Sequence, residues 1–264
     1  MKVGFIGLGT QGKPLAVNLA RSEHDVMVYD IQREPLGELA SAGARIAHSN
    51  REVGAHGELI EICVLNDAQL EDVVLGPDGV LAGARPGNII AVHSTVEPST
   101  ISRLAEAAAD RDVELIDAPV SGSDRGAKAK TMSYMVGGSE AAFEACRPIF
   151  EISGTKITHT GPLGTGIRAK LAHQLIICIN MLAAYEGMRL GREAGLSPEI
   201  LEKVVREGMA QSAIAEHWSQ LSLAPRATSV FFKDLELCLK FAHELGMPAP
   251  GAALTQQLLD HIVP

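Results

Sequence analysis

A glycine-rich hexapeptide directly after an apolar run is the feature that most limits what this sequence can fold into. Residues 2–6 are typical of a buried strand, and Gly7, Gly9 and Gly12 then follow in a GxGxxG spacing before a helical pattern. In a strand–turn–helix unit the first glycine allows a tight turn, the second lets the backbone approach a pyrophosphate, and the third lets the helix pack on the sheet. The spacing therefore predicts a dinucleotide site at the N-terminus of a helix.

An acidic residue at the end of the second apolar run predicts which dinucleotide is bound. A carboxylate at this position, Asp30, accepts hydrogen bonds from a ribose 2′-hydroxyl and repels a 2′-phosphate. Arg33 is the nearest cation, and a solvated surface charge is the simplest interpretation of it. We therefore expect NAD to be preferred over NADP. The residues expected to contact this cofactor are Gly7, Gly9, Thr10, Gln11, Gly12 and Asp30.

Apolar runs alternate with helical patterns through the first half of the chain. The runs cover residues 2–6, 26–29, 60–65, 88–92, 113–117 and 133–136. This alternation predicts parallel βαβ units with a sheet buried on both faces, although Glu61 interrupts the third run. After Gly161 the pattern is helical to the end. We expect an α/β Rossmann domain with a parallel sheet over residues 1–162, and an all-α domain over residues 163–264 that begins with a long interdomain helix.

The predicted interdomain helix, residues 167–194, is nearly apolar all round, so it must be buried in a core or against another subunit. Lys170 lies at its start. Desolvation would lower the pKa of an ammonium there towards a value useful in general acid/base catalysis, and a lysine that extends its ammonium back to water is the alternative. His173 and Gln174 share the face of Lys170, which favours contact with a substrate; a hydrogen-bonded core histidine fits the pattern equally well.

Residues 117–123 form a loop of small residues after a predicted strand. Ser121 offers a hydroxyl, and Gly122 and Ser123 offer unhindered N–H groups, which together suit a carboxylate. A simple turn is the alternative. No histidine lies near Ser121 in the sequence to activate it as a nucleophile, and no His/Cys spacing indicates a metal site.

Composition argues against several classes of partner. The formal net charge is −9 and basic residues are not clustered, so we expect no nucleic acid partner. The four cysteines are far apart, which predicts neither a metal site nor a disulfide framework. The most apolar run, residues 175–184, is broken by Asn180 and is too short to cross a bilayer. We expect a cytoplasmic protein without a membrane partner and, because the sequence closes on apolar residues, a further helix beyond Pro264.

Six ordered motifs resemble those of the β-hydroxyacid dehydrogenase family, which includes 3-hydroxyisobutyrate dehydrogenase, tartronate semialdehyde reductase and, more distantly, 6-phosphogluconate dehydrogenase. The motifs begin at Phe5, Ser94, Asp117, Met135, Gly164 and Phe232 and span essentially the whole chain. The resemblance implies NAD-dependent hydride transfer between a small 3-hydroxy acid and its semialdehyde or 3-keto acid, in a homodimer or homotetramer. It implies that Lys170 is catalytic and that Ser121 and Gly122 bind the substrate carboxylate. The further cofactor contacts that it implies are Leu65, Asn66, Thr95 and Lys233.

Several positions depart from the family pattern. His173 and Gln174 stand where Asn-Asn or Asn-Gln is usual, Ser123 and Lys130 stand where glycines are usual, and Gln11 replaces a common methionine. These departures leave the substrate undefined within the class of small carboxylate-bearing molecules. An imine reductase and a non-catalytic dinucleotide-binding protein on the same scaffold are the alternatives, but such relatives generally lack the lysine at position 170.

Overall fold

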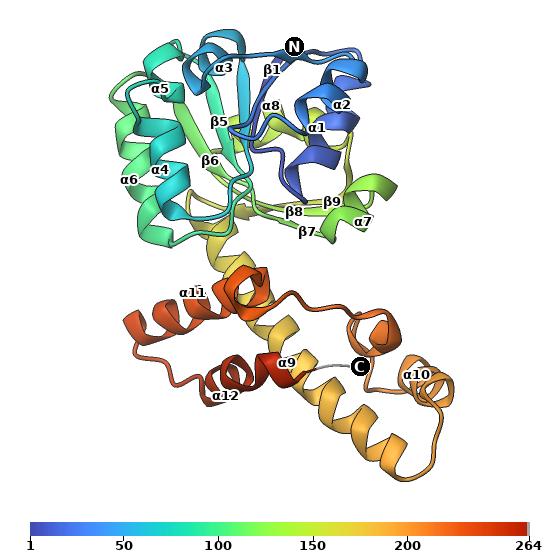
Figure 1. The fold of residues 1–264 in the computed structure, drawn as a ribbon. Coiled ribbons are helices and arrows are strands. Elements are labelled where there is room, and N and C mark those ends of the chain that lie inside the picture. Colours follow the sequence, from blue (N-terminus) through green and yellow to red (C-terminus); the bar gives the residue numbers. More distant parts are fainter. Residues whose placement is uncertain (263–264) are drawn as a thin grey trace. The chain divides into compact units, whose positions relative to one another are not determined.

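The computed structural model describes residues 1–262, and the helix expected beyond Pro264 lies outside the described residues. The chain forms two compact units, Met1–Lys170 and Leu171–Pro264 (Figure 1). The first is an α/β unit and the second is helical, which confirms the predicted fold class. The division falls within the long helix α9 (Thr165–Glu193), whereas the predicted domain boundary between residues 162 and 163 precedes that helix.

A nine-stranded sheet runs through the first unit in the order β3-β2-β1-β4-β5-β6-β8-β7, with β9 paired to β8. The strands are β1 (Lys2–Ile6), β2 (Asp25–Tyr29), β3 (Arg45–Ile46), β4 (Leu59–Ile62), β5 (Ile89–Val92), β6 (Glu114–Asp117), β7 (Val120–Ser121), β8 (Met132–Gly137) and β9 (Gly154–Gly161). Strands β1 to β6 are parallel. The strand order reverses between β1 and β4, and ligands of such sheets bind at the carboxyl ends beside this switch point.

The six predicted strands correspond to β1, β2, β4, β5, β6 and β8, but the sheet is not parallel throughout. Strand β8 runs antiparallel to β6 and β7. The sequence does not predict β3, β7 or β9. Strands β3 and β7 have only two residues each, too few to show a period. Strand β9 is mostly polar and only partly buried, so it lacks the apolar run that marks the other strands.

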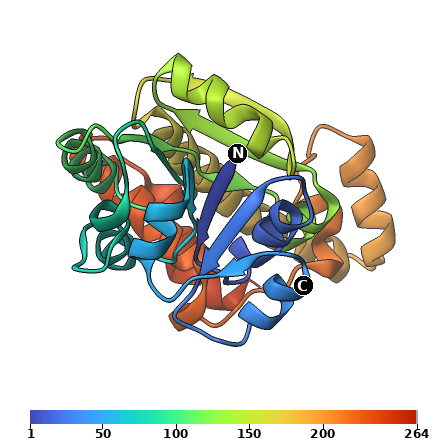
Figure 2. The ribbon, with the colours of Figure 1, turned by 90° about the horizontal axis from the view of Figure 1, so that it is seen from above.

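Helices cover both faces of the sheet, and each face has its own apolar core. The helices are α1 (Gly12–Ala20), α2 (Leu36–Ser41), α3 (Asn50–His56), α4 (Asp67–Leu75), α5 (Val80–Gly83), α6 (Pro98–Ala109), α7 (Ser123–Ala129) and α8 (Glu140–Phe150). Residues of α1, α2, α7 and α8 pack in one core and residues of α3 to α6 in the other (Figures 1 and 2). The sheet is therefore buried on both faces, as predicted from its apolar runs.

The second unit contains no strand among its described residues. Its elements are the remainder of α9, α10 (Pro198–Glu207), α11 (Val230–Glu244), α12 (Pro250–Leu258) and the 3₁₀ turns η1 (Ala215–Gln220), η2 (Arg226–Thr228) and η3 (Leu259–His261). Helix α10 begins directly after Ser197, whose side chain accepts the N–H of Ile200 and caps the helix. Between Gly208 and Ser229 only short 3₁₀ turns form, so the expectation of an uninterrupted helical pattern is wrong there.

Helix α9 is buried less completely than its apolar sequence predicts. Ile167, Cys178 and Met181 are fully buried, whereas Ile176 and Leu190 expose 59% and 73% of their surface. By length and composition alone α9 would pass for a membrane-spanning helix. Its buried residues contribute to apolar cores in both units, which is the behaviour of a core helix. The exposed apolar side chains leave a part of α9 without cover in the described chain.

Candidate active site

Residues 7–12, the glycine turn, lie between β1 and α1 at the switch point of the sheet. Gly7 has φ +92°, and a side chain there would overlap the Cys63 carbonyl oxygen. A side chain at Gly12 would overlap the Gly7 carbonyl oxygen, so this glycine is required for α1 to pack closely. A Cβ at Gly9 would meet nothing within 4 Å. Open space at Gly9 and crowding at the other two glycines fit a turn that receives a pyrophosphate.

The Asp30 carboxylate is held in a fixed orientation directly after β2. Its Oδ2 accepts the Leu8 N–H at 2.6 Å, and its Oδ1 accepts the Gln32 N–H at 2.7 Å. Each oxygen retains a lone pair that can accept a ribose hydroxyl. Arg33 is exposed, as expected of a surface charge. Asp30 is therefore tied to the glycine turn through Leu8.

The other predicted cofactor residues of this unit follow β4 and β5 at the same edge of the sheet. Leu65 is 54% exposed, and Thr95 is half-buried. The Asn66 side chain accepts the Gln69 N–H at 3.0 Å and thereby caps α4. Ser94 Oγ accepts the Val64 N–H at 2.9 Å, which joins the two segments. The carboxyl ends of β1, β4 and β5 thus carry the predicted cofactor residues side by side.

Lys170 is buried in the first unit, with 6% of its surface exposed. Its Nζ donates a hydrogen bond to the Val120 carbonyl oxygen at 2.8 Å. A lysine that reached back to water would expose its ammonium, so this geometry does not match the alternative interpretation. Because Val120 precedes Ser121 in β7, the contact brings the predicted catalytic and substrate-binding residues together.

Asp117 fixes the start of the helix that carries Lys170. Its Oδ1 accepts the Gly164 N–H at 2.7 Å and its Oδ2 accepts the Ile167 N–H at 2.6 Å, so the carboxylate satisfies N–H groups at the first turn of α9. A Cβ at Gly137 would lie 2.5 Å from Oδ1, which leaves room for glycine only. Burial raises the pKa of Asp117 to about 6, although the two N–H donors pull it down. Sequence reasoning missed this role.

Residues 117–123, the serine loop, run from the end of β6 through β7 to the start of α7. Ser121 is half-buried, and Gly122 and Ser123 are exposed. Gly122 has φ +139° and Ser123 has φ +56°. Consecutive residues with such backbone angles turn their N–H groups towards one side, which favours an anion. The loop therefore has the groups that a carboxylate site requires.

Two of the departures from the family pattern occupy the left-handed backbone region. Ser123 has φ +56° and Lys130, at the C-terminus of α7, has φ +58°. The backbone thus keeps a conformation that glycine adopts without strain. A third departure, Gln11, donates a hydrogen bond from Nε2 to the Ser123 carbonyl oxygen at 3.4 Å, which connects the glycine turn to the serine loop.

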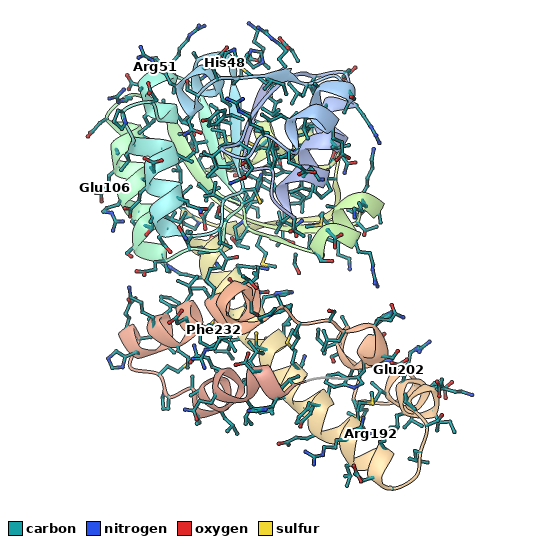
Figure 3. The ribbon with its side chains drawn as sticks, viewed as in Figure 1. His48, Arg51, Glu106, Arg192, Glu202 and Phe232 are labelled. Atoms are coloured by element: carbon teal, nitrogen blue, oxygen red, sulfur yellow. The ribbon has the colours of Figure 1, made fainter. Side chains whose placement is uncertain are left out.

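The remaining predicted site residues lie in the second unit and gather around a buried acid. Asp234 is 1% exposed; its Oδ1 lies 2.8 Å from Lys233 Nζ, and its Oδ2 accepts a hydrogen bond from Gln174 Nε2. His173 Nδ1 lies 3.3 Å from Gln174 Oε1. Phe232, the neighbour of Lys233 on α11, is labelled in Figure 3. Asp234 thus orients two predicted site residues, and sequence reasoning gave it no role.

Two family models match almost the whole chain. The NAD binding domain of 6-phosphogluconate dehydrogenase matches residues 2–161, and the NAD-binding model of NADP-dependent 3-hydroxyisobutyrate dehydrogenase matches residues 164–263. The chain belongs to the β-hydroxyacid dehydrogenase family. It is therefore an NAD(P)-dependent oxidoreductase of the hydroxyacid class, and the family and reaction class expected from its motifs are confirmed.

Named relatives of this family cover both units. The 3-hydroxyisobutyrate dehydrogenase of Pseudomonas aeruginosa is 36% identical over 98% of this chain and 91% of its own length. The 2-hydroxy-3-oxopropionate reductase of Escherichia coli is 35% identical over 98% of this chain and 90% of its own length. Among solved structures, Mycobacterium tuberculosis 3-hydroxyisobutyrate dehydrogenase with L-serine has a TM-score of 0.85 at 26% identity, covering 98% of this chain and 92% of that one.

Metal-site geometry is not found in the described part of the chain, where no group of three His, Cys, Asp or Glu residues could hold an ion. The four cysteines carry no disulfide. Burial raises the pKa of the Cys63 thiol to about 12, so this cysteine beside the glycine turn stays protonated. Lys170, whose Nζ contacts the Val120 carbonyl oxygen, and the hydroxyl of Ser121 are the predicted site residues beside the serine loop that can transfer a proton or bind a polar group.

Proposed function

We propose that this chain uses NAD, in preference to NADP, to oxidise a small 3-hydroxy acid to its semialdehyde or 3-keto acid. The observation that carries the proposal is the hydrogen bond from Lys170 Nζ to the Val120 carbonyl oxygen at 2.8 Å. It holds a buried amine next to Ser121, in a loop suited to a carboxylate. A substrate whose acid group lies on this loop presents its neighbouring hydroxyl to the amine.

Lys170 is proposed to accept the hydroxyl proton as the alcohol is oxidised. Exclusion from water favours the neutral amine, which is the form able to take the proton. The Val120 carbonyl oxygen accepts a hydrogen bond from either form, so Nζ stays in place through the transfer. Bound NAD supplies the hydride acceptor. In the reverse direction the protonated Lys170 returns the proton to the carbonyl oxygen.

The Ser121 hydroxyl and the N–H groups of Gly122 and Ser123 are proposed to hold the substrate carboxylate. Support comes from their backbone angles and from the chemistry of the relatives' names. 3-Hydroxyisobutyrate and L-serine each carry a carboxylate and a hydroxyl on carbon 3, and 2-hydroxy-3-oxopropionate carries a carbonyl there. A panel of the two hydroxy acids and their amides, assayed for NAD reduction by absorbance, together with 2-hydroxy-3-oxopropionate assayed for NADH oxidation, tests the substrate class. Reduction of imines with no activity on the acids would favour the imine reductase alternative instead.

Asp30 supports the preference for NAD. Its carboxylate is fixed by Leu8 and Gln32 where a ribose 2′-hydroxyl is expected, and a 2′-phosphate there would meet a negative charge. We expect kcat/KM to be higher with NAD than with NADP, and Asp30→Asn to narrow the difference. A clear preference of the unaltered protein for NADP would contradict this part of the proposal.

Lys170→Ala and Lys170→Arg test the catalytic role. Turnover is expected to fall by about 10²- to 10⁴-fold in Lys170→Ala, the range for a lost general acid/base. Lys170→Arg is expected to lose nearly as much turnover, because a guanidinium stays protonated and cannot accept the proton. Hydride transfer is measured in a single turnover, with NAD affinity and the unfolding temperature determined alongside. NAD affinity is expected to change little, because the glycine turn is a separate segment.

Lys128 offers a matched control. It is an exposed lysine of α7 that pairs with Asp124 at 2.9 Å, so Lys128→Ala removes a lysine without touching Lys170 or Val120. We expect its turnover to equal that of the unaltered chain. Near-normal hydride transfer in Lys170→Ala would contradict the proposal. Lost NAD affinity with unchanged chemistry would show that Lys170 is only structural.

We further propose that the chain acts as a cytoplasmic homodimer or homotetramer, without nucleic acid or membrane partners. The support for an oligomer is the apolar surface left uncovered on the second unit, where Ile200 and Val204 of α10 are 51% and 61% exposed and Leu190 of α9 is 73% exposed. Light scattering after size-exclusion chromatography measures the mass directly. A monomer at micromolar concentration would contradict this proposal without affecting the catalytic one.

A further inference from the structure

A buried pair of titratable residues, Glu61 and His93, lies in the first unit and has no part in the proposed mechanism. Glu61 is 2% exposed on β4, and His93 is 3% exposed directly after β5. His93 Nε2 lies 3.0 Å from Glu61 Oε1. His93 Nδ1 lies 2.8 Å from the Ala118 carbonyl oxygen. The imidazole ring therefore bridges three neighbouring strands.

The hydrogen-bond partners of the His93 ring determine which of its nitrogens carry a proton. A carbonyl oxygen only accepts, so Nδ1 must carry a proton towards Ala118. Between Nε2 and the Glu61 carboxyl group one proton is shared, whether the pair is charged or neutral. Burial raises the pKa of Tyr134 well above its usual value and that of Cys63 to about 12, and Glu61 adds to both effects. These two neighbours therefore stay protonated and add no negative charge beside the Glu61–His93 pair.

Burial of this pair among aromatic rings costs free energy of folding. The rings of Phe5, Tyr134 and Phe150 have centroids 6.3, 5.7 and 5.7 Å from that of His93. Glu61 Oε2 is buried without a hydrogen-bond partner in the described structure. Apolar residues of similar size would fill such a site with no loss of stability, and often with a gain. An unsatisfied buried carboxylate therefore calls for a role other than stability.

The three strands that His93 joins lead directly into the functional segments. Glu61 precedes Leu65 on the β4 side, His93 precedes Thr95, and Ala118 precedes Val120 in the serine loop. The Ala118 N–H also donates to the Val92 carbonyl oxygen at 2.8 Å. Ala118 is therefore bound through its N–H to β5 and through its carbonyl oxygen to His93, the residue after β5. The position of the Val120 carbonyl oxygen, which holds Lys170, thus depends on the segment that His93 anchors.

We propose that Glu61 and His93 are positioning residues, which hold Ala118 and with it the Val120 carbonyl oxygen at the place where Lys170 Nζ must stand for proton transfer. This inference rests on the proposed role of Lys170. It assigns Glu61–His93 no contact with substrate or cofactor. The required element is the pair of simultaneous hydrogen bonds made by the ring, one to Glu61 and one to Ala118.

The double variant Glu61→Leu with His93→Phe separates positioning from stability. It replaces the pair by apolar side chains that suit the aromatic surroundings, so the unfolding temperature is expected to stay equal or to rise. The loss of both ring hydrogen bonds leaves the Ala118 carbonyl oxygen without its His93 partner and held only through its N–H, and kcat is expected to fall by about 10- to 100-fold, as for a small misplacement of a catalytic group. KM for NAD is expected to change less than twofold. Unchanged kcat in a stably folded double variant overturns the proposal.

A combination with Lys170→Ala shows whether the pair acts through Lys170. If it does, adding the double variant to Lys170→Ala lowers hydride transfer no further, whereas a general disturbance of the unit lowers it again. Tyr134→Phe is the matched control, because it alters the same aromatic surroundings without touching Ala118, and its kcat is expected to be unchanged. Between two single variants, Glu61→Leu is expected to lower kcat, and Glu61→Gln is expected to retain most of it, since an amide N–H can donate to a neutral His93 Nε2.

The protonation of His93 can be measured by spectroscopy on the unaltered chain, so this test does not depend on whether any variant folds. Nitrogen-15 NMR of labelled histidine is expected to show a protonated Nδ1 in His93 with a proton protected from exchange with water. An unprotonated Nδ1 overturns the inference. If Lys170→Ala retains hydride transfer, the proposed function itself is wrong; if Lys170→Ala fails as expected but the double variant keeps its kcat, only the positioning role is wrong.

Discussion

The glycine turn and the serine loop both follow strands of the same sheet, yet they meet their backbone requirements in different ways. In the glycine turn, glycines stand at the two positions where a side chain would overlap backbone atoms, Gly7 and Gly12. In the serine loop and the helix after it, Ser123 and Lys130 hold positive φ angles with ordinary side chains. The difference shows which segment is fixed by crowding and which one tolerates strain.

Where a side chain would overlap backbone atoms, only glycine fits. A positive φ angle costs a non-glycine residue about 1–2 kcal/mol, which favourable interactions elsewhere in the fold can offset. The cofactor segment therefore keeps all three glycines of the family pattern, and its departure, Gln11, stands where a methionine is common. The substrate segment departs from the pattern at Ser123. Gln11 itself donates to the Ser123 carbonyl oxygen, so the one departure in the glycine turn is in contact with the departure in the serine loop. We infer that the two changes adapt to each other.

The largest expected effect is that of Gly12→Ala. The new Cβ would overlap the Gly7 carbonyl oxygen, which cannot move without breaking the turn. We expect the free energy of unfolding to fall by about 3 kcal/mol or more and NAD binding to be lost. Chemical denaturation and a fluorescence titration with NAD measure the two quantities. A stable Gly12→Ala variant that binds NAD normally would refute the claim that crowding fixes the turn.

Gly9→Ala is the matched control for that variant. Its Cβ would meet no atom within 4 Å, so the free energy of unfolding is expected to change by less than about 1 kcal/mol. NAD affinity is nevertheless expected to fall, because the added methyl group occupies the space where the pyrophosphate approaches. An equal loss of stability in both variants would show that the two glycines do not differ as the structure indicates.

A second prediction concerns the anchor of the serine loop, Asp117. Its pKa in the folded state is about 6, above the model-compound value of 3.8. Because this pKa is raised, the contribution of Asp117 to stability is present below about pH 4 and is lost as the pH rises through 6. The loss amounts to roughly 3 kcal/mol at 1.36 kcal/mol per pKa unit. We expect Asp117→Asn to lack this component when the free energy of unfolding is measured from pH 4 to pH 7.

The difference between the two proteins is the quantity to plot, since other carboxylates also titrate in this range. Asparagine has only one side-chain acceptor oxygen, so one of the N–H groups of Gly164 and Ile167 loses its partner. That loss is independent of pH and lowers the whole curve. A difference curve without slope between pH 4 and pH 7 would show that burial of Asp117 does not raise its pKa.

The pattern of apolar runs and glycines predicts most of the first unit, because these signals are local. The strands β1, β2, β4, β5, β6 and β8 and the glycine turn were all visible in this way. The pairings that organise the site are not local. Glu61 reads as an interruption of its strand because its partner, His93, lies 32 residues away. Asp117 reads as part of a loop because the N–H of Gly164 that it caps lies 47 residues away.

The same reasoning explains the second unit. Lys233 was identified through the family resemblance and Gln174 through its place on the helix face of Lys170, but the acid that orients both, Asp234, makes its contact with Gln174 across 60 residues. Apolar residues that recur every three or four positions reveal that a helix has an apolar and a polar face. It does not reveal which side chain of a distant helix meets a given polar residue. The signal available for Asp234 was only its place beside Lys233.

A third prediction tests the serine loop as a carboxylate site. A hydroxyl hydrogen bond to a charged group contributes roughly 1.5–3 kcal/mol, so Ser121→Ala should lower kcat/KM for the acid by about 10- to 200-fold. Because Ser121 is half-buried at the end of β7, the unfolding temperature is expected to change little. Steady-state kinetics with an acid and its amide measure the effect. If the variant loses as much activity on the amide as on the acid, Ser121 does not bind the carboxylate.

The smallest expected effect is a gain in stability from restoring glycine. In Lys130→Gly and Ser123→Gly the left-handed backbone loses its steric strain, but glycine also raises the entropy of the unfolded chain. The free energy of unfolding is therefore expected to rise by less than about 1 kcal/mol for each variant. Asp112 is the matched control: it also has a positive φ, 56°, but aspartate adopts this region readily, so Asp112→Gly should gain less. Denaturant titrations of the three variants give the ranking. Equal changes at all three positions would mean that the serine loop stores no more strain than an ordinary turn, and the contrast with the glycine turn would rest on crowding alone.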